Sequence, residues 1–282
     1  MIVCGGYGAQ RSWCLAADAH DATDVVETGA DAPDAAPVRP FDDHIVLRFE
    51  TDAPNGLQPT GAWRDLSKAA RTVNIATGTP VVQFSGDAGA QGIVFGAGGP
   101  IFEVPDSPDL RFGTTDDFFV VARATVEVPA GSGSGCAFHY LFAKYSTADS
   151  TTGPHLRVCA DTTRDLVGSL KLGAGDAKIV VPAPLTTGYG VVSFGRNLNG
   201  TRIETYGAGA SIEVAVPSLF DVSSGGSPFM VGGHRSGGTG GAGGPWFGKI
   251  NRLYVYHAPG GTFSAADFAT IRSYVSGAAP LP

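Results

Sequence analysis

Three large side chains flank a glycine-rich segment near the end of the chain. His234 and Arg235 precede this segment, and Trp246 follows it. An aromatic ring beside hydrogen-bond donors can stack on a sugar or contact a protein. Glycines leave main-chain donors and acceptors open to a close approach. We therefore predict that His234, Arg235 and Trp246 form a ligand-binding rim. In the alternative interpretation, the Trp246 ring packs in the core.

The acidic residues do not form a catalytic pattern. Hydrolysis of a glycosidic bond requires two carboxylates that face the sugar together. Glu103, Asp106 and Asp109 have a loosely suitable spacing, but Pro105 and Pro108 interrupt a regular strand there. The six histidines lack metal-ligand spacing, and the sequence contains no serine nucleophile elbow. We predict no catalytic residues, and we expect that the protein is not an enzyme.

The chain contains four cysteines, Cys4, Cys14, Cys136 and Cys159. An even number permits two disulfides without establishing them. Cys4 and Cys14 are close enough in sequence for a small loop, and Cys136 and Cys159 lie in or beside two strands that we expect to be neighbours. All four are disulfide candidates. The alternative is two buried thiols and two thiols in the N-terminal segment.

The net charge of −7 is unevenly distributed along the chain. Residues 1–40 hold six acidic side chains against Arg11 and Arg39, a net charge of −4, which leaves −3 on the remainder. Residues 15–40 are mainly Ala, Asp, Thr and Pro, and such a segment buries too little apolar surface to offset its ordering entropy. We predict an acidic tether over residues 1–40, followed by one domain over residues 41–282.

Charge and hydropathy also argue against two kinds of partner. Basic residues are not clustered enough to follow a phosphate backbone, so we do not expect nucleic acid as a partner. No apolar run is long enough to span a bilayer, so we predict no transmembrane segment. Residues 1–8 lack the basic and apolar regions of a signal peptide, so a complete signal is not predicted in this sequence.

The spacing of apolar residues predicts strands. Phe118 to Val128 alternates cleanly, which indicates a strand with one core face and one face turned toward water. Residues 137–146 and 155–160 predict a neighbouring pair of strands. Residues 166–172 and 178–181 predict a hairpin. Together these segments indicate strands that follow one another closely along the chain.

Tight turns connect further short strands in the second half of the chain. Asn199-Gly200 forms one turn, and Gly207-Ala208-Gly209 forms the next. Short strands joined by Asn-Gly and glycine-rich turns are typical of antiparallel sheets. We therefore predict an all-β domain.

One helix is predicted close to the C-terminus. Ser264 is a favourable N-cap, and Asp267 follows three residues later, as in a capping box. Phe263 and Phe268 occupy the hydrophobic staple positions. Phe268, Ile271 and Val275 share one face at helical spacing, so we expect the helix to dock through this apolar stripe.

The order of these motifs resembles the laminin G-like jelly roll of the concanavalin A-like lectin and glucanase superfamily. The matching motifs include Val46-Leu47-Arg48-Phe49, Trp63-Arg64-Asp65-Leu66-Ser67, Trp246-Phe247-Gly248-Lys249-Ile250 and Leu253-Tyr254-Val255-Tyr256. The resemblance covers about residues 44–276. It implies a jelly-roll β-sandwich of two antiparallel sheets with a short C-terminal helix. This chain carries Ala208 where relatives often have Asn.

Calcium is the one cofactor that the resemblance suggests. Family sites use one or two Asp carboxylates with main-chain carbonyls at the rim of the sandwich. Asp117, Asp149 and Asp161 are the candidate donors. The alternative is that these Asp residues are solvated or cap turns, as Asp residues commonly do in loops.

The function expected from these patterns is non-catalytic binding of a glycan or protein, outside the cell or at its surface. The alternative is a structural subunit of a larger assembly, such as a virion or a surface appendage, in which the domain packs against its neighbours. A third hypothesis is a glycan hydrolase of the same superfamily.

Overall fold

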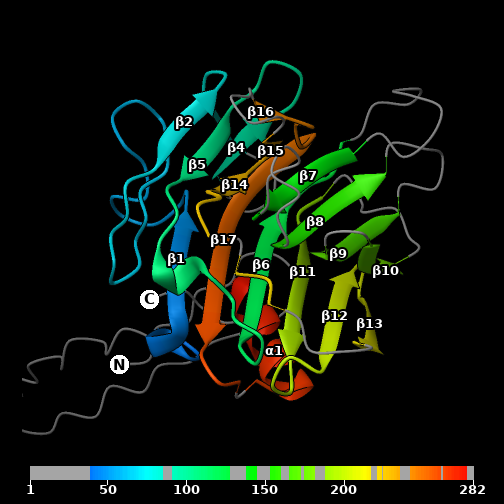
Figure 1. Cartoon of the computed structure of the whole chain (residues 1–282). Helices are drawn as coiled ribbons and strands as arrows, with labels where there is room; N and C mark the ends of the chain where they lie inside the picture. Colours follow the sequence, from blue (N-terminus) through cyan, green and yellow to red (C-terminus); the bar gives the residue numbers. More distant parts are fainter. Residues whose placement is uncertain are drawn as a thin grey trace, which may run out of the picture. The chain divides into compact units, whose positions relative to one another are not determined.

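The fold was analysed in a computed structural model that describes residues 39–84, 91–127, 138–144, 153–159, 165–172, 175–181, 188–216, 221–223, 225–235, 242–261 and 263–277. Within these residues the chain forms two large antiparallel sheets and one α-helix, as Figure 1 shows. The predicted class is therefore confirmed: an all-β sandwich with a short C-terminal helix. Of the predicted tether, only residues 39 and 40 are described.

The first sheet has eight strands within the described residues. Its order is β13 (Ala210–Ala215), β12 (Arg202–Gly207), β11 (Gly190–Asn197), β6 (Asp117–Ala124), β17 (Gly248–Ala258), β4 (Gln91–Phe95) and β3 (Val81–Phe84), and β1 (Ile45–Glu50) also pairs with β17. The long strand β17 therefore pairs with three strands that come much earlier in the chain, β1, β4 and β6.

The second sheet has seven strands among the residues described. Its order is β10 (Gly175–Val181), β9 (Leu166–Leu172), β8 (Gly153–Cys159), β7 (Phe138–Ala143), β14 (Phe229–Val231), β5 (Ile101–Val104) and β2 (Asn74–Thr77). A small ribbon pairs β15 (His234–Arg235) with β16 (Ala242–Gly243). Two short 3-10 helices, η1 (Asp42–His44) and η2 (Pro108–Leu110), precede β1 and β6.

Two predicted strand pairs are confirmed. β7 pairs antiparallel with β8, and β9 pairs with β10 in the expected hairpin. Both predicted turns are present, with positive φ at Asn199, Gly200, Ala208 and Gly209. Ala208 adopts φ 51°, a left-handed conformation that Asn tolerates better than Ala.

The main core lies between the two sheets. Phe118, Val120 and Ala122 of β6 all face it, as the alternation in the sequence predicts. At one end of the core, the Trp63 ring stacks on Phe49 with 5.2 Å between ring centroids. Apolar side chains from both sheets are removed from water here, which is the main favourable contribution to folding.

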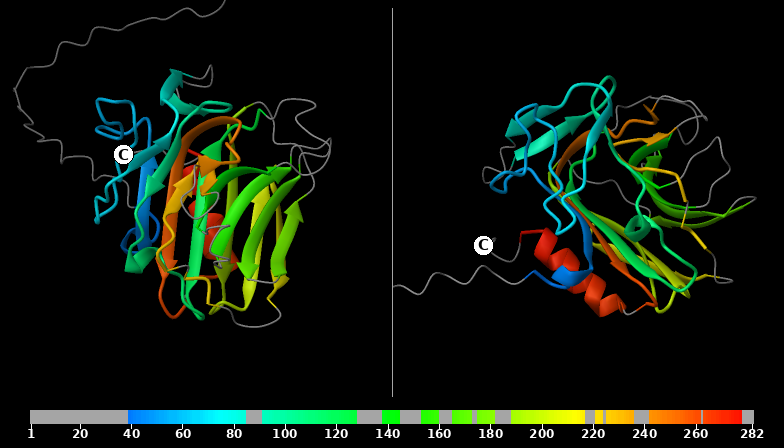
Figure 2. Two further views of the ribbon diagram at one scale, coloured as in Figure 1. Left: turned by 45° about the horizontal axis from the view of Figure 1, so that its top comes forward. Right: turned by 60° about the vertical axis from the view of Figure 1, so that its left-hand side comes forward.

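The prediction of a wet outer face on β6 is wrong. Phe119 and Val121 point away from the main core, yet both are fully buried in a second apolar cluster with Tyr254 and Tyr256 of β17. Helix α1 (Ala265–Val275) covers this cluster from outside the sandwich, as the right-hand view of Figure 2 shows. The wet face was predicted because local alternation along one strand does not reveal a distant helix that packs on it.

The structure of α1 agrees with the prediction. The Ser264 side chain accepts a hydrogen bond from the Asp267 backbone N–H, and the Asp267 carboxylate accepts one from the Ser264 backbone N–H. The Phe268 ring stacks on Phe119 with a centroid distance of 3.9 Å. Gly195 of β11 makes room for this stack, since a Cβ there would lie 2.8 Å from the Phe268 ring and 2.6 Å from the Phe119 ring.

We expect Phe268→Ala to lower the free energy of unfolding by about 3–5 kcal/mol, because it removes a fully buried ring from the cluster beneath α1. Urea unfolding followed by circular dichroism measures the change. The matched control is Ser273→Ala at an exposed position of the same helix, with an expected change within about 0.5 kcal/mol. Equal effects of the two substitutions would show that the helix does not stabilise the sandwich.

Candidate functional site

The predicted rim residues His234 and Arg235 form strand β15 and are half-buried. The chain reaches this strand from β14 through Gly232, which has φ +78°. A Cβ at Gly232 would lie 2.2 Å from the Phe95 ring, so glycine is needed for the chain to turn there. This turn places the His234 ring 4.5 Å from the Tyr140 ring of β7, measured between centroids.

Trp246 is not on the rim. Its side chain is fully buried in the main core, and its indole N–H donates to the Thr125 carbonyl at 3.1 Å. Its backbone N–H also bonds the Gly232 carbonyl. The core alternative therefore describes this residue, and the prediction that its ring faces a ligand is withdrawn. His234 and Arg235 remain as candidate binding residues.

The outer face of the seven-stranded sheet brings His234 together with polar side chains that sequence analysis did not single out. These are Tyr140 of β7, His155 and Arg157 of β8, and Ser169 and Lys171 of β9, and with His234 we name them the basic–aromatic cluster. They alternate with core residues such as Leu156, Val158 and Leu170. Alternation along each strand therefore places the cluster on the face opposite the core.

Cross-strand pairing holds the members of the basic–aromatic cluster side by side. Tyr140 pairs with Arg157, and His155 pairs with Ser169. The Arg157 Nη1 donates to the Tyr140 hydroxyl at 3.4 Å, and the guanidinium lies 5.9 Å from the centre of that ring. The His155 ring is 5.6 Å from the Tyr140 ring. Tyr140 is thus the shared neighbour of a cation and two imidazoles.

The floor of the cluster is buried, and its two cations and the His234 ring are only half-buried. Tyr140, His155 and Ser169 are at most 3% exposed, whereas Arg157, Lys171 and His234 are half-buried. Charged groups retain part of their contact with water in this arrangement, which avoids the large cost of burying an ion. The half-buried cations are therefore positioned to contact a ligand that rests on this face.

The two imidazoles of the cluster are neutral near pH 7. Burial holds the pKa of His155 well below its ordinary value, and the positive charges of Arg157 and Lys171 lower it further. Burial also lowers the pKa of His234; a hydrogen bond with the Gly243 backbone opposes this shift. A neutral imidazole offers one donor and one acceptor, which suits hydroxyl groups. Arg157 and Lys171 supply the positive charge.

The candidate calcium donor Asp117 has a structural role here. It is fully buried, and its two carboxylate oxygens accept the backbone N–H groups of Gly200 and Phe263, each at 3.0 Å. Asp149 and Asp161 lie outside the described residues. Within the described part of the chain, His, Cys, Asp and Glu side chains form no group of three or more that could hold a metal ion. A calcium site stays a prediction.

Cys159 of β8 is disulfide-bonded. The other candidates, Cys4, Cys14 and Cys136, lie outside the described residues. The pairing Cys136–Cys159 therefore stays a prediction. None of the helices in the described residues is both long and apolar enough to span a membrane.

Sequence analysis missed Tyr140, His155, Arg157 and Lys171 as site residues. The signal was present in the predicted strands, because the polar residues His155 and Arg157 of β8 alternate with the apolar residues Leu156 and Val158. Such spacing indicates a polar outer face but does not show which strands lie next to one another. The pairing of β7 with β8 and of β8 with β9, and the approach of β15 to β7, depend on the tertiary structure and cannot be predicted from one segment of sequence.

No protein-family model matches this chain, and no curated protein matches it. Solved structures do match. The binding domain of Paraclostridial Mosquitocidal Protein 1 has a TM-score of 0.59 and 13% sequence identity, covering 83% of this chain and 53% of that one. The binding domain of botulinum neurotoxin serotype D has a TM-score of 0.54 and 10% identity, covering 83% and 52%.

A third match is the binding domain of botulinum neurotoxin DC, solved in complex with rat synaptotagmin II, with a TM-score of 0.54, 10% identity and coverage of 83% and 52%. At such identities these matches establish a shared β-sandwich fold. The present chain spans about half the length of the binding domains it matches. The narrower resemblance to laminin G-like domains stays a prediction.

We expect the domain to lose stability as the pH falls below about 6.5, the ordinary histidine value. The folded chain keeps His155 neutral, while the unfolded chain takes up a proton there, so stability is present above this pH and decreases below it. His139, His234 and His257 contribute in the same direction, because burial lowers the pKa of each.

His155→Gln removes one of these protonation differences. Urea unfolding between about pH 7.5 and pH 5.5 should show a shallower loss of stability for the variant, by up to about 1.4 kcal/mol per pH unit. An unchanged slope would mean that His155 is protonated in the folded domain.

Proposed function

We propose that this domain is a non-catalytic binding module and that the basic–aromatic cluster binds an acidic glycan. The observation that carries the proposal is the arrangement of Arg157, Lys171 and His234 around the buried Tyr140 and His155 on one sheet face. Carboxylate or sulfate groups on a sugar would accept charge-assisted hydrogen bonds from the guanidinium and the ammonium. The neutral imidazole of His234 can bond a neighbouring hydroxyl.

The buried floor prepares the site for binding. The Arg157 side chain is held by both the hydroxyl and the ring of Tyr140, which limits its rotamers. A side chain already held in place loses less conformational entropy when the ligand binds. The cluster therefore offers an Arg157 side chain that is already oriented, on an interior strand of the seven-stranded sheet.

A non-catalytic role is supported by the condition of the carboxylates. Asp106 is one of the three acidic residues whose spacing loosely resembles a catalytic pair. Its carboxylate forms ion pairs with Arg111 and with the buried Lys144. Asp109 pairs with Arg71. Each of these carboxylates is committed to a cation, which favours the ionised form and does not suit a general acid.

The proposed setting is the cell exterior or surface. The disulfide at Cys159 supports it, because disulfides persist mainly in oxidising compartments. The matching solved structures are binding domains of a mosquitocidal protein and of botulinum neurotoxins by name, and one was solved in complex with the protein rat synaptotagmin II. A protein ligand at the same face is therefore the second candidate, and a structural role in a larger assembly is the third.

A glycan array that includes neutral, sialylated, uronic-acid and sulfated sugars tests the proposal. We expect binding to acidic sugars only, weakening as salt screens the charges. Arg157→Ala and Lys171→Ala should each reduce affinity about tenfold, since each removes a charge-assisted contact. Arg64→Ala, an exposed arginine on a loop elsewhere, is the control and should leave affinity unchanged.

Two results would contradict the proposal. Equal binding of neutral and acidic sugars would remove the role of the cations. Full affinity in both Arg157→Ala and Lys171→Ala would place the ligand on another face. A domain that binds no sugar but assembles into a symmetric complex would favour the structural alternative.

A further inference from the structure

A small cavity lies at the start of β1, away from the basic–aromatic cluster. Its volume is about 150 Å³, and its lining residues are Arg39, Asp42, Ile45, Arg48, Leu66, Ser67 and Lys68. Ile45 belongs to the apolar cluster beneath α1, so the cavity borders the outer side of the eight-stranded sheet. The proposed glycan site lies on the other sheet, and the two regions share no residue.

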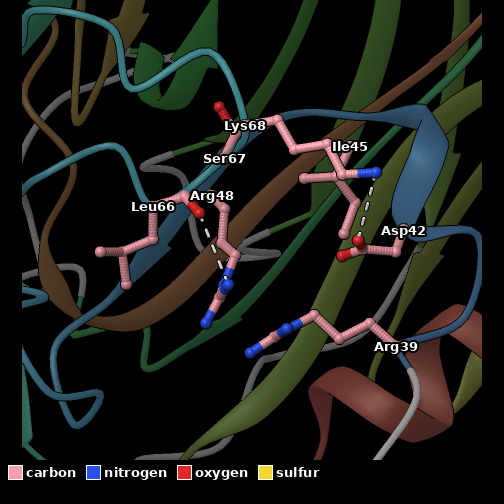
Figure 3. Close-up of a pocket in the computed structure, with 7 residues that line it drawn as sticks. All are labelled: Arg39, Asp42, Ile45, Arg48, Leu66, Ser67 and Lys68. Carbon is pink, nitrogen blue, oxygen red and sulfur yellow. Dashed lines mark hydrogen bonds and ion pairs between the residues drawn. The ribbon is translucent and has the colours of Figure 1, made fainter.

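Two guanidinium groups enter this cavity. Figure 3 shows the side chains of Arg39 and Arg48 pointing toward one another. Arg48 donates to the Glu50 carboxylate at 2.8 and 3.2 Å. Burial alone would lower the pKa of Arg48, but the Glu50 charge outweighs it, so the pKa is raised and Arg48 stays positive.

Arg39 differs from Arg48 because no carboxylate of the described residues forms an ion pair with it. Its Nε atom is buried and makes no hydrogen bond, and no ion pair links Arg39 to any residue that the structure describes. The Lys68 ammonium turns away from it toward Asp42 and Asp43, as Figure 3 shows for Asp42. Among the residues described, the acidic groups near the cavity thus pair with Lys68 and Arg48, and none of them pairs with Arg39.

Two buried tyrosine hydroxyls also lack a hydrogen-bond partner among the described residues. The Oη atoms of Tyr256 and Tyr274 are buried without a hydrogen-bond partner in the described structure. Burial raises the pKa of Tyr256; Tyr274 and Asp42 raise it further and Arg39 lowers it, so this hydroxyl lies within electrostatic reach of the cavity. A buried donor without an acceptor costs free energy. The Arg39 Nε atom and the Tyr256 hydroxyl, which lies within electrostatic reach of Arg39, are therefore both buried without a hydrogen-bond partner among the described residues.

We propose that this cavity binds a small oxyanion, a carboxylate or a sulfate, held between the guanidinium groups of Arg39 and Arg48. The planar fork of a guanidinium presents two N–H groups to two oxygens of such an anion. Water alone could satisfy the tyrosine hydroxyls, but it carries no charge to neutralise Arg39. The cavity opens on a different sheet from the glycan site, so an anion here is a second ligand.

The experiment uses the full chain and titrates sodium sulfate or sodium acetate against sodium chloride at equal ionic strength. Isothermal titration calorimetry gives the affinity. The midpoint of thermal unfolding should rise with anion concentration, because a ligand of the folded state stabilises it. Sulfate also stabilises proteins through exclusion from their surface, so the specific effect is the difference between wild type and variant.

Arg39→Gln is the informative variant, because Arg39 has no described partner that the substitution would strand. We expect it to weaken anion binding at least about tenfold, whereas the control Arg64→Gln changes it less than about twofold. Binding of acidic glycans should be unaffected by Arg39→Gln. Loss of glycan binding in Arg157→Ala with intact sulfate binding would separate the two sites.

Crystals soaked in selenate, an anomalously scattering analogue of sulfate, locate the anion directly. The expected result is an anomalous peak between the two guanidinium groups. Absence of that peak, or equal responses of wild type and Arg39→Gln to sulfate and acetate, would show that the cavity holds water only and would overturn the proposal.

Discussion

Burial of the central strands on both faces is the constraint on which the sandwich depends. Phe118 of β6 packs into the main core while the next residue, Phe119, packs against Phe268 of α1. A strand that is apolar on both faces must be covered twice, since exposed apolar surface is unfavourable in water. The seven-stranded sheet covers one face, and the C-terminal helix covers the other.

The carboxylates of Asp116 and Asp117, at the start of β6, bind the segment that leads into α1. Asp117 binds the backbone N–H of Phe263 just before α1, and Asp116 binds that of Gly260 and the His257 ring. Backbone N–H groups bonded to an anion are satisfied without a helix or a sheet. Asp117, which first suggested a metal site, thus connects the segment before the helix to the eight-stranded sheet.

The seven-stranded sheet differs in what its outer face carries. Where β6 has Phe119 and Val121, β8 has His155 and Arg157 at equivalent alternate positions. Polar side chains contribute less to stability on burial than apolar ones of similar size. We attribute their presence on this face to the proposed binding of a ligand, and β15 brings His234 to the same place.

Local pattern was sufficient to predict much of this fold. The capping box at Ser264, the apolar face of β6 and the hairpin of β9 and β10 all follow from spacing within one segment. The packing of α1 on the outer face of β6 could not be predicted, because the stack of Phe119 on Phe268 joins segments far apart in the sequence.

The candidate site likewise contains one residue that local sequence indicated and others that only the strand order brings together. His234 was found from its place beside a glycine-rich segment, but its neighbours Tyr140 and Arg157 depend on the strand order of the sheet. Trp246 resembled a rim residue because it follows the same glycines. The close passage of Gly232 over Phe95 turns the chain, and Trp246 lies in the core.

A crystal structure of the domain with a bound acidic oligosaccharide tests the central claim most directly. The account predicts that the acidic group of the sugar lies within hydrogen-bond distance of Arg157 and Lys171, on the outer face of the seven-stranded sheet, with His234 at its edge. A sugar bound on the eight-stranded sheet, or one whose acidic group points away from both cations, would contradict it.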